Sequence, residues 1–122
     1  MKLFFDGGCR PNPGTMEIAV VAAGRATVLP DIGHGTSEDA EWLALIHALT
    51  VARSLDARDV VLLGDAIDVI AKASGKIECH GATACHLERF RALASDMAPP
   101  RLRYVKRSQN LAGIALARLH AR

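Results

Sequence analysis

The stretch FDGGCRPNPG, residues 5–14, is the most informative segment of the chain. The residues just before its aspartate, 2–5, form a short apolar run with two aromatic side chains, which predicts a buried strand that ends at Asp6. Residues 7–14 contain three glycines, two prolines and one asparagine, a composition that predicts a structured loop and no helix or strand. An aspartate between a buried strand and such a loop is well placed to face a ligand.

The hydrophobic pattern outward from this segment predicts alternating strands and helices. Four further strands are expected from β-branched or continuous apolar runs, at residues 16–23, 26–29, 60–64 and 102–105. Four helices are expected from apolar spacing, caps and breakers, at residues 36–54, 67–73, 83–97 and 110–120. The order β-β-β-α-β-α-α-β-α implies a mixed sheet with helices packed on its faces.

The first long helix has the clearest start and the clearest apolar face. Thr36 can cap it, and Asp39 three residues later completes a variant of the capping box. Glu38 and Asp39 are expected to face solvent, where they complement the helix dipole. Trp42, next to Glu41, is expected to pack beside a functional site at Glu41 or on the opposite flank of the helix. Residues at helical spacing are expected to form the inner face: Ala40, Leu43, Ala44, His47, Ala48 and Val51.

Size and composition indicate one domain spanning residues 1–122. Half of the residues are hydrophobic (50%) and 23% are charged, which excludes wholesale disorder, collagen-like repeats and a coiled coil. The longest apolar run, about six residues, is far below the ~20 needed to span a bilayer. Because Asp6 also interrupts any signal-peptide core, we expect a cytoplasmic protein with no membrane partner. The net charge of +2 limits nucleic-acid binding to local patches, and three cysteines argue against a disulfide framework.

Three carboxylates fall where a metal site is expected. Asp6 and Asp65 each follow a predicted strand, and they lie side by side if these two strands are parallel neighbours in the sheet. Glu41 is the only acid within the apolar segment 40–44. Clustered carboxylates need a neutralising cation, and hard oxygen ligands without Cys or His imply Mg²⁺ or Mn²⁺. Such a cluster suits two-metal phosphoryl transfer, whereas the simpler alternative is that each aspartate is a turn residue.

Four segments together carry a family resemblance. FDGGCRPNPG (5–14) resembles the opening motif of the type 1 ribonuclease H family, and AEWLALIHAL (40–49) resembles its catalytic-glutamate helix. VVLLGD (60–65) resembles the strand with the second aspartate, and YVKRSQN (104–110), followed by Leu-Ala at 116–117, resembles the C-terminal segment. The likeness is to the short, reverse-transcriptase-like form and covers nearly the whole chain in the right order.

The resemblance implies a fold, an activity and a set of site residues. The implied fold is α/β and ribonuclease H-like, a five-stranded mixed sheet of three antiparallel strands and then two parallel ones, with helices on both faces. The implied activity is endonucleolytic cleavage of the RNA strand of RNA–DNA hybrids with Mg²⁺ or Mn²⁺; we expect nucleic acid as the partner and favour a monomer. The implied catalytic residues and metal ligands are Asp6, Glu41 and Asp65. The implied substrate contacts are Gly7, Gly8, Cys9, Arg10, Asn12, Arg107 and Asn110.

The chain departs from the family pattern at the fourth carboxylate. The family places an aspartate four residues after the asparagine of its last motif, and here that position is Ile114, which cannot ligate a metal. One metal is therefore expected to bind weakly or to use a substitute ligand or a substrate phosphate. Ala66 also replaces the usual serine, and the basic insertion of longer members is absent. A modest basic cluster could meet phosphates or form a solvated edge strand: Arg101, Arg103, Lys106 and Arg107.

Two other functions are compatible with the same residues. Ile114 favours a catalytically weakened or inactive homologue that acts as a nucleic-acid-binding domain, because a fold does not guarantee an activity. A third possibility is an interaction module unrelated to nucleic acid, which would show no hybrid binding at low salt.

Cysteine and histidine residues offer a competing metal site. Cys79-His80 and Cys85-His86 form a C-H-x₄-C-H pattern that lacks the usual zinc spacing. Adjacent helical residues diverge by about 100°, so Cys85 and His86 are poorly placed to bind one ion together. The alternative is a buried Cys85 and an exposed loop around His80.

Overall fold

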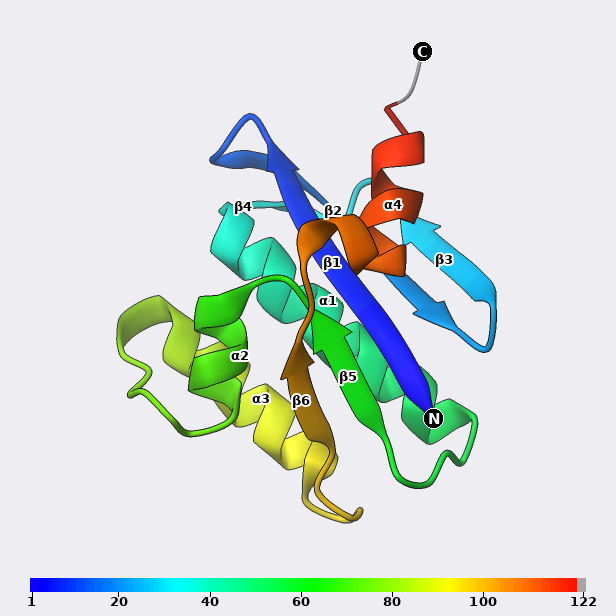
Figure 1. Ribbon diagram of the computed structural model, residues 1–122. Helices are drawn as coiled ribbons and strands as arrows, with labels where there is room; N and C mark the ends of the chain where they lie inside the picture. Colours follow the sequence, from blue (N-terminus) through cyan, green and yellow to red (C-terminus); the bar gives the residue numbers. More distant parts are fainter. Residues whose placement is uncertain (121–122) are drawn as a thin grey trace.

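The fold is a mixed six-stranded sheet with helices on both faces, in a computed structural model that describes residues 1–120 (Figure 1). This confirms the α/β class and the helices on both faces. The strands are β1 (Lys2–Arg10), β2 (Gly14–Ala22), β3 (Arg25–Leu29), β4 (His34–Gly35), β5 (Val61–Gly64) and β6 (Arg101–Tyr104). The α-helices are α1 (Ser37–Ser54), α2 (Ile67–Ala73), α3 (Ala84–Ala94) and α4 (Leu111–Arg118), and short 3₁₀ turns lie at Gly81–Thr83 and Arg107–Gln109.

The order of the strands brings two aspartates level with each other. The sheet runs β3-β2-β1-β5-β6, with β1, β2 and β3 antiparallel and with β5 and β6 parallel to β1, as predicted. The parallel ladder between β1 and β5 ends at the pair Phe4–Leu63. Asp6 and Asp65 each come two residues later, so both lie at the same edge of the sheet, just beyond this ladder.

The segment from residue 7 to residue 10 is strand, and the predicted loop there is wrong. The β1–β2 ladder continues from Gly7, opposite Ile18, to Arg10, opposite Thr15. The prolines, which cannot donate to a ladder, lie only at positions 11 and 13, so the connection shrinks to residues 11–13. The two-residue strand β4 also escaped prediction and pairs with the start of β2, which makes six strands instead of five.

Helix α1 lies at the centre of the main core. Its capping box is present, because Thr36 Oγ1 accepts from the Asp39 amide and the Asp39 carboxylate accepts from the Thr36 amide. The predicted inner face is shifted, since Leu43, His47 and Val51 are only half-buried. The helix packs against the sheet on one side and α3 on another, so more than one face is covered. Its buried side chains are Ala40, Trp42, Ala44, Leu45, Ile46, Ala48, Leu49 and Ala52.

The charged residues at the start of α1 are tied to neighbouring helices. Glu38 accepts from Lys72 Nζ at 3.1 Å, and Asp39 Oδ1 lies 2.9 Å from His86 Nε2. The His86 ring in turn stacks on the fully buried Trp42, with ring centroids 6.2 Å apart. Both acids are half-buried, so the prediction that they face solvent is wrong: they join α1 to α2 and α3.

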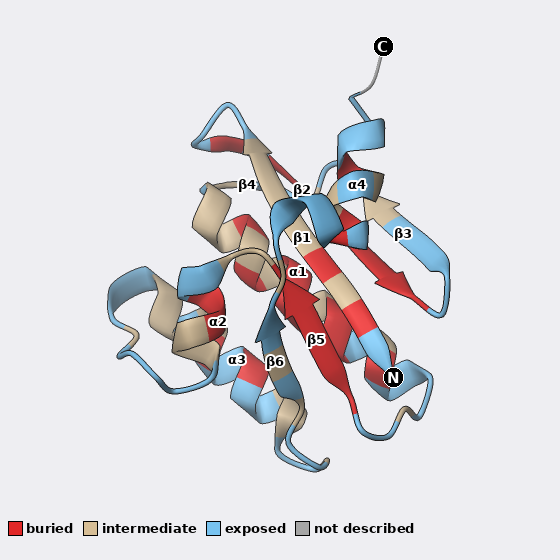
Figure 2. Cartoon of the chain, in the orientation of Figure 1, coloured by how far each residue is buried: buried red, intermediate tan, exposed pale blue. Residues whose placement is uncertain are grey.

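The two faces of the sheet are covered unequally. Helices α1, α2 and α3 pack on one face around the larger core, whereas α4 alone covers part of the other (Figure 1). The cluster beneath α4 has four buried members: Ala19, Val21, Ala112 and Leu116. Strand β5 is buried throughout, while β6 is an exposed edge (Figure 2). Of the helices in residues 1–120, none is both long enough and apolar enough to cross a membrane.

Candidate active site

Asp6, Glu41 and Asp65 come together from three different elements. Asp6 lies on β1, Asp65 follows β5, and Glu41 lies in the first part of α1. One carboxylate oxygen from each residue lies within 4.8 Å of the other two. Within the described residues 1–120, this is the one group of three or more Asp, Glu, His or Cys side chains close enough to hold a metal ion. The structure thus brings together the three acids that the sequence singled out.

Gly7 allows β1 and α1 to approach closely at the site. A Cβ atom at Gly7 would lie 2.2 Å from the carbonyl oxygen of Ala40, far inside normal contact distance. The Gly7 amide donates a hydrogen bond to Glu41 Oε1 at 2.5 Å. Strand β5 pairs with β1 only as far as Phe4. The Gly7 amide lies beyond this ladder and can donate to the Glu41 side chain. Gly7 therefore fixes Glu41 beside Asp6.

Burial and mutual repulsion disfavour the ionised forms of Asp6 and Glu41. Burial, and next the negative charge of Asp65, raise the pKa of Asp6 to about 7, although the Arg107 guanidinium opposes the rise. Burial, and next the charge of Asp6, raise the pKa of Glu41 to about 8, although the Gly7 amide favours the ionised form. A cation among these carboxylates would stabilise the ionised forms, so the site favours binding of a positive charge.

Asn110 supports the acids from inside the protein. Its side chain is fully buried, and Nδ2 donates to the Phe5 carbonyl oxygen at 3.0 Å and to Asp65 Oδ2 at 3.4 Å. Its Oδ1 accepts from the Ala112 amide at 3.1 Å, which caps α4. The polar atoms of Asn110 thus hold Asp65 and the start of α4. Its predicted contact with substrate stays a prediction.

Replacing this residue, Asn110→Ala, is expected to lower the free energy of unfolding by about 2 kcal/mol, because a cap is lost and buried polar groups lose their partner. Urea denaturation followed by circular dichroism measures this change. Gln109→Ala, at the exposed neighbouring position, is the matched control and should change the free energy of unfolding by less than about 0.5 kcal/mol. Equal effects of the two substitutions would contradict the role given to Asn110.

The acids open into a cavity of about 380 Å³. Residues 7–10 of β1 line one side, and Arg107 lies near the acids. Arg10 and Arg107 contribute positive charge, while the glycines expose backbone. A cavity with acids, cations and bare backbone suits an anionic ligand that is bound together with a metal. On α4 the cavity is bordered by Gly113, Leu116 and Ala117.

Two other predicted contact residues organise the segment next to the cavity. Asn12 is exposed, and its Oδ1 accepts from the Ser37 amide at 3.0 Å, which ties the β1–β2 connection to the start of α1. Cys9 lines the cavity, and its Sγ lies 3.0 Å from the Pro11 carbonyl oxygen and 3.1 Å from that of Gly35. Their contacts with substrate stay predictions.

Ile114 lies where the family pattern places its fourth carboxylate, and it is 39% exposed on α4. The helix comes close to the acids at the preceding residue, since a Cβ atom at Gly113 would lie 3.5 Å from Asp6 Oδ2. Helix α4 thus reaches the site without bringing a negative charge to it.

Glu17 is a site residue that the sequence analysis missed. It lies on β2, is only 5% exposed and lines the same cavity as the three acids. Both of its carboxylate oxygens contact His120 Nε2, at 2.6 and 2.8 Å. One signal could have revealed it, because Glu17 is the only charged residue in the apolar run at 16–23.

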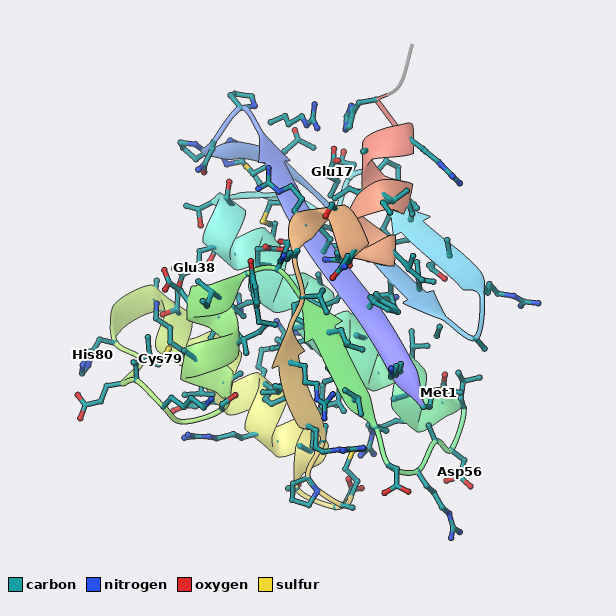
Figure 3. All side chains as sticks on the ribbon, in the orientation of Figure 1. Met1, Glu17, Glu38, Asp56, Cys79 and His80 are labelled. Atoms are coloured by element: carbon teal, nitrogen blue, oxygen red, sulfur yellow. The ribbon has the colours of Figure 1, made fainter. Side chains whose placement is uncertain are left out.

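The cysteine and histidine pairs form no metal site within residues 1–120. Cys79 Sγ contacts Thr83 Oγ1 at 3.2 Å, and His80 pairs at 3.0 Å with Glu78 in an exposed loop (Figure 3). Cys85 is exposed, so the expectation that it is buried is wrong.

Comparison with known families agrees with this geometry. The family model described as "Reverse transcriptase-like" matches residues 5–120. The chain belongs to the reverse transcriptase-like family. The predicted resemblance is therefore confirmed, and the match spans all three acids. A search of curated proteins returned no match.

Solved structures of ribonucleases H are similar to this reverse transcriptase-like chain. It is similar to ribonuclease H1 from the halophilic archaeon Halobacterium salinarum NRC-1, with a TM-score of 0.84, 27% identity, and coverage of 94% of this chain and 92% of that one. It is also similar to the N-terminal ribonuclease H domain of a Mycobacterium tuberculosis protein, solved as a maltose-binding protein fusion, with a TM-score of 0.78, 30% identity, and coverage of 94% and 93%. It shares the fold of LC11 ribonuclease H1, isolated from compost and solved with an RNA/DNA hybrid, with a TM-score of 0.80, 19% identity, and coverage of 94% and 91%.

Proposed function

We propose that this protein is an endonuclease that cleaves the RNA strand of RNA–DNA hybrids by divalent-metal-assisted hydrolysis. The observation that carries the proposal is the convergence of Asp6, Glu41 and Asp65 within 4.8 Å, at a cavity with two arginines. Membership of the reverse transcriptase-like family supports the reaction class. The hybrid bound to LC11 ribonuclease H1, a protein of the same fold, supports the substrate class.

The three carboxylates fit a hard divalent cation. They offer oxygen ligands only. Burial, and next the charge of a neighbouring carboxylate, raise the pKa values of Asp6 and Glu41, and a bound cation would favour the ionised forms. A bound Mg²⁺ or Mn²⁺ would supply Lewis acidity and a more acidic bound water. The chain orients two ligands in advance, because the Gly7 amide holds Glu41 and Asn110 holds Asp65.

The remaining cavity residues suit the backbone of a nucleic acid. Gly8 presents bare backbone, which allows a sugar-phosphate chain to approach and to bond through its 2′-hydroxyl groups. Arg10 and Arg107 line the same cavity and provide positive charge for phosphates. We assign hybrid binding to this surface on those grounds.

A second candidate function is hybrid binding without turnover. Ile114 favours it, because the family's fourth acid is missing at that position. This function requires salt-sensitive binding of the hybrid and no cleavage in excess Mn²⁺.

A cleavage assay with a labelled RNA–DNA hybrid separates the two candidates. The endonuclease proposal expects internal cuts in the RNA strand with Mg²⁺ or Mn²⁺, none with EDTA, and none in a DNA duplex of the same sequence. Binding of the hybrid with no cuts in either metal would overturn the proposal and favour the second candidate. Failure to bind the hybrid at low salt would exclude both.

The metal-free protein is expected to lose stability as the pH rises. A carboxyl group with a raised pKa in the folded state stabilises the fold while it is protonated. Its contribution is complete below about pH 4, the usual range of unfolded carboxyls. It falls as the pH increases and is lost above the folded-state pKa values of about 7 for Asp6 and about 8 for Glu41.

Urea denaturation in EDTA at about pH 5.5 and about pH 8.5 measures this loss. The double variant Asp6→Asn/Glu41→Gln removes both titrating groups and should flatten the pH dependence. Mg²⁺ should raise the midpoint more at the higher pH, because the carboxyls are then ionised. An equally steep pH dependence in the double variant would contradict this assignment.

A further inference from the structure

Four carboxylates line the cavity, although the family's fourth acid is replaced. Asp6, Glu41 and Asp65 form the cluster described above, and Glu17 is the additional one. It comes from β2, whereas the family pattern places its fourth acid on the last helix, at the position of Ile114. The cavity therefore has four acids, as in the family pattern, but one of them comes from a strand and not from the last helix.

The register of the sheet places Glu17 on the same face as Asp6. Glu17 pairs with Gly8, and Ala19 pairs with Asp6, so the two acids lie on neighbouring strands, two residues apart in register. Side chains alternate between the two faces along a strand. Ala19 belongs to the apolar cluster beneath α4, and Asp6 lies against Gly113 of that helix. Glu17 and Asp6 therefore both face α4.

Gly8, the sheet partner of Glu17, lines the same cavity. A Cβ atom at Gly8 would lie 3.7 Å from Glu17 Cγ and 3.7 Å from a methyl carbon of Leu116. A larger residue at this position would therefore take up cavity space beside Glu17. Glycine at this position adds no side chain to the cavity that Glu17 and the cluster share.

The burial of Glu17 requires a partner. The residue is 5% exposed, and a buried carboxylate is costly unless it is paired. Its hydrogen bonds in the described structure both come from His120 Nε2, at 2.6 and 2.8 Å. His120 follows the end of α4, and its side chain is 35% exposed (Figure 3 shows Glu17 beside α4). A single, partly exposed side chain thus holds Glu17.

We propose that Glu17 is the fourth carboxylate of the metal centre. His120 holds it in the metal-free protein, and Glu17 exchanges this partner for a divalent cation when the site is loaded. The inference rests on the proposed function, since it assigns an additional ligand to the same metal-dependent site. It makes His120 a competitor of the metal, which is a testable property.

Titration calorimetry with Mn²⁺ alone, without nucleic acid, tests the competition. Glu17→Gln should weaken Mn²⁺ binding by about tenfold, because one charged ligand is lost. His120→Ala should tighten it by about tenfold, because a charge-assisted hydrogen bond no longer has to be broken. If the Glu17–His120 pair were only structural, the two substitutions would not change Mn²⁺ affinity in opposite directions. A raised dissociation constant for Glu17→Gln and a lowered one for His120→Ala would therefore support the proposal.

His80→Ala removes an exposed histidine–glutamate pair away from the cavity and is the matched control, with unchanged Mn²⁺ affinity expected. Mn²⁺ binding that is lost in Asp6→Asn but unaltered in Glu17→Gln and His120→Ala would overturn this inference and leave the proposed function standing. Equal weakening in Glu17→Gln and His120→Ala would also overturn it. A parent protein that binds no Mn²⁺ would overturn the proposed function and the inference together.

Discussion

Asp6→Asn is expected to reduce hybrid cleavage by at least about 10²-fold, because it removes a charged ligand at the centre of the acid cluster. Asparagine has nearly the shape of aspartate, so the surrounding contacts are kept. Burial raises the pKa of Asp6 to about 7, and a neutral side chain therefore suits the metal-free fold. Initial rates with Mg²⁺ and a thermal unfolding curve of the same variant measure the two effects separately.

A matched exposed acid provides the control for this substitution. Asp68 lies on α2, three residues after Asp65, and its side chain is exposed. Asp68→Asn should leave the cleavage rate within about twofold of the parent, because surface charges have small effects. If Asp6→Asn cleaved as fast as Asp68→Asn, the assignment of the acid cluster as the catalytic centre would fail.

Gly7→Ala is the second substitution with a large expected effect. The new Cβ atom would lie 2.2 Å from the Ala40 carbonyl oxygen, 2.4 Å from its carbon and 2.7 Å from the Glu41 amide nitrogen. All three are backbone atoms, so the strand and the helix must move apart. Overpacking of this kind costs about 1–3 kcal/mol of unfolding free energy. The shift also separates Asp6 from Glu41, so we expect cleavage to fall by about 10²-fold.

Gly8→Ala is the neighbouring control for stability. Its Cβ atom would meet Glu17 Cγ and Leu116 at 3.7 Å, which is ordinary van der Waals contact. The unfolding free energy should therefore change by less than about 0.5 kcal/mol. Urea denaturation of both variants gives the comparison. A Gly7→Ala protein as stable as Gly8→Ala would show that β1 and α1 are not in close contact.

The order of the elements and the three acids could be predicted from sequence because their signals are local. Each signal predicts the structure of the residues around it: the apolar run at 60–64, the Thr36 cap, and the prolines at 11 and 13. The parallel pairing of β1 with β5, which the family resemblance implied, brings Asp6 level with Asp65. Glu41 stood out as the only acid in an apolar part of its helix.

What could not be predicted depends on contacts between distant segments. The strand character of residues 7–10 comes from pairing with β2, which overrides their glycine-rich composition. The buried stripe of α1 is wider than one face because α3 covers a second side, and no periodicity in α1 alone reveals α3. The buried hydrogen bonds of Asn110 could not be predicted because its acceptors, Phe5 and Asp65, are far away in sequence.

The same reasoning explains why Glu17 was missed. Its partner, His120, lies 103 residues further along the chain, and neither residue belongs to a recognisable motif. Only the sheet register and the end of α4 bring them together at the cavity.

The small apolar cluster beneath α4 has a consequence for local unfolding. An element held by few buried side chains opens at a lower free energy than the main core, and α4 buries only Ala112 and Leu116 within its length. When α4 lifts from the sheet, Gly113 leaves Asp6, and the Asn110 bridge to Asp65 loses its anchor. We therefore expect the supports that Gly113 and Asn110 give to Asp6 and Asp65 to be lost in a partial opening, with the amides of α4 exchanging hydrogen sooner than those of α1.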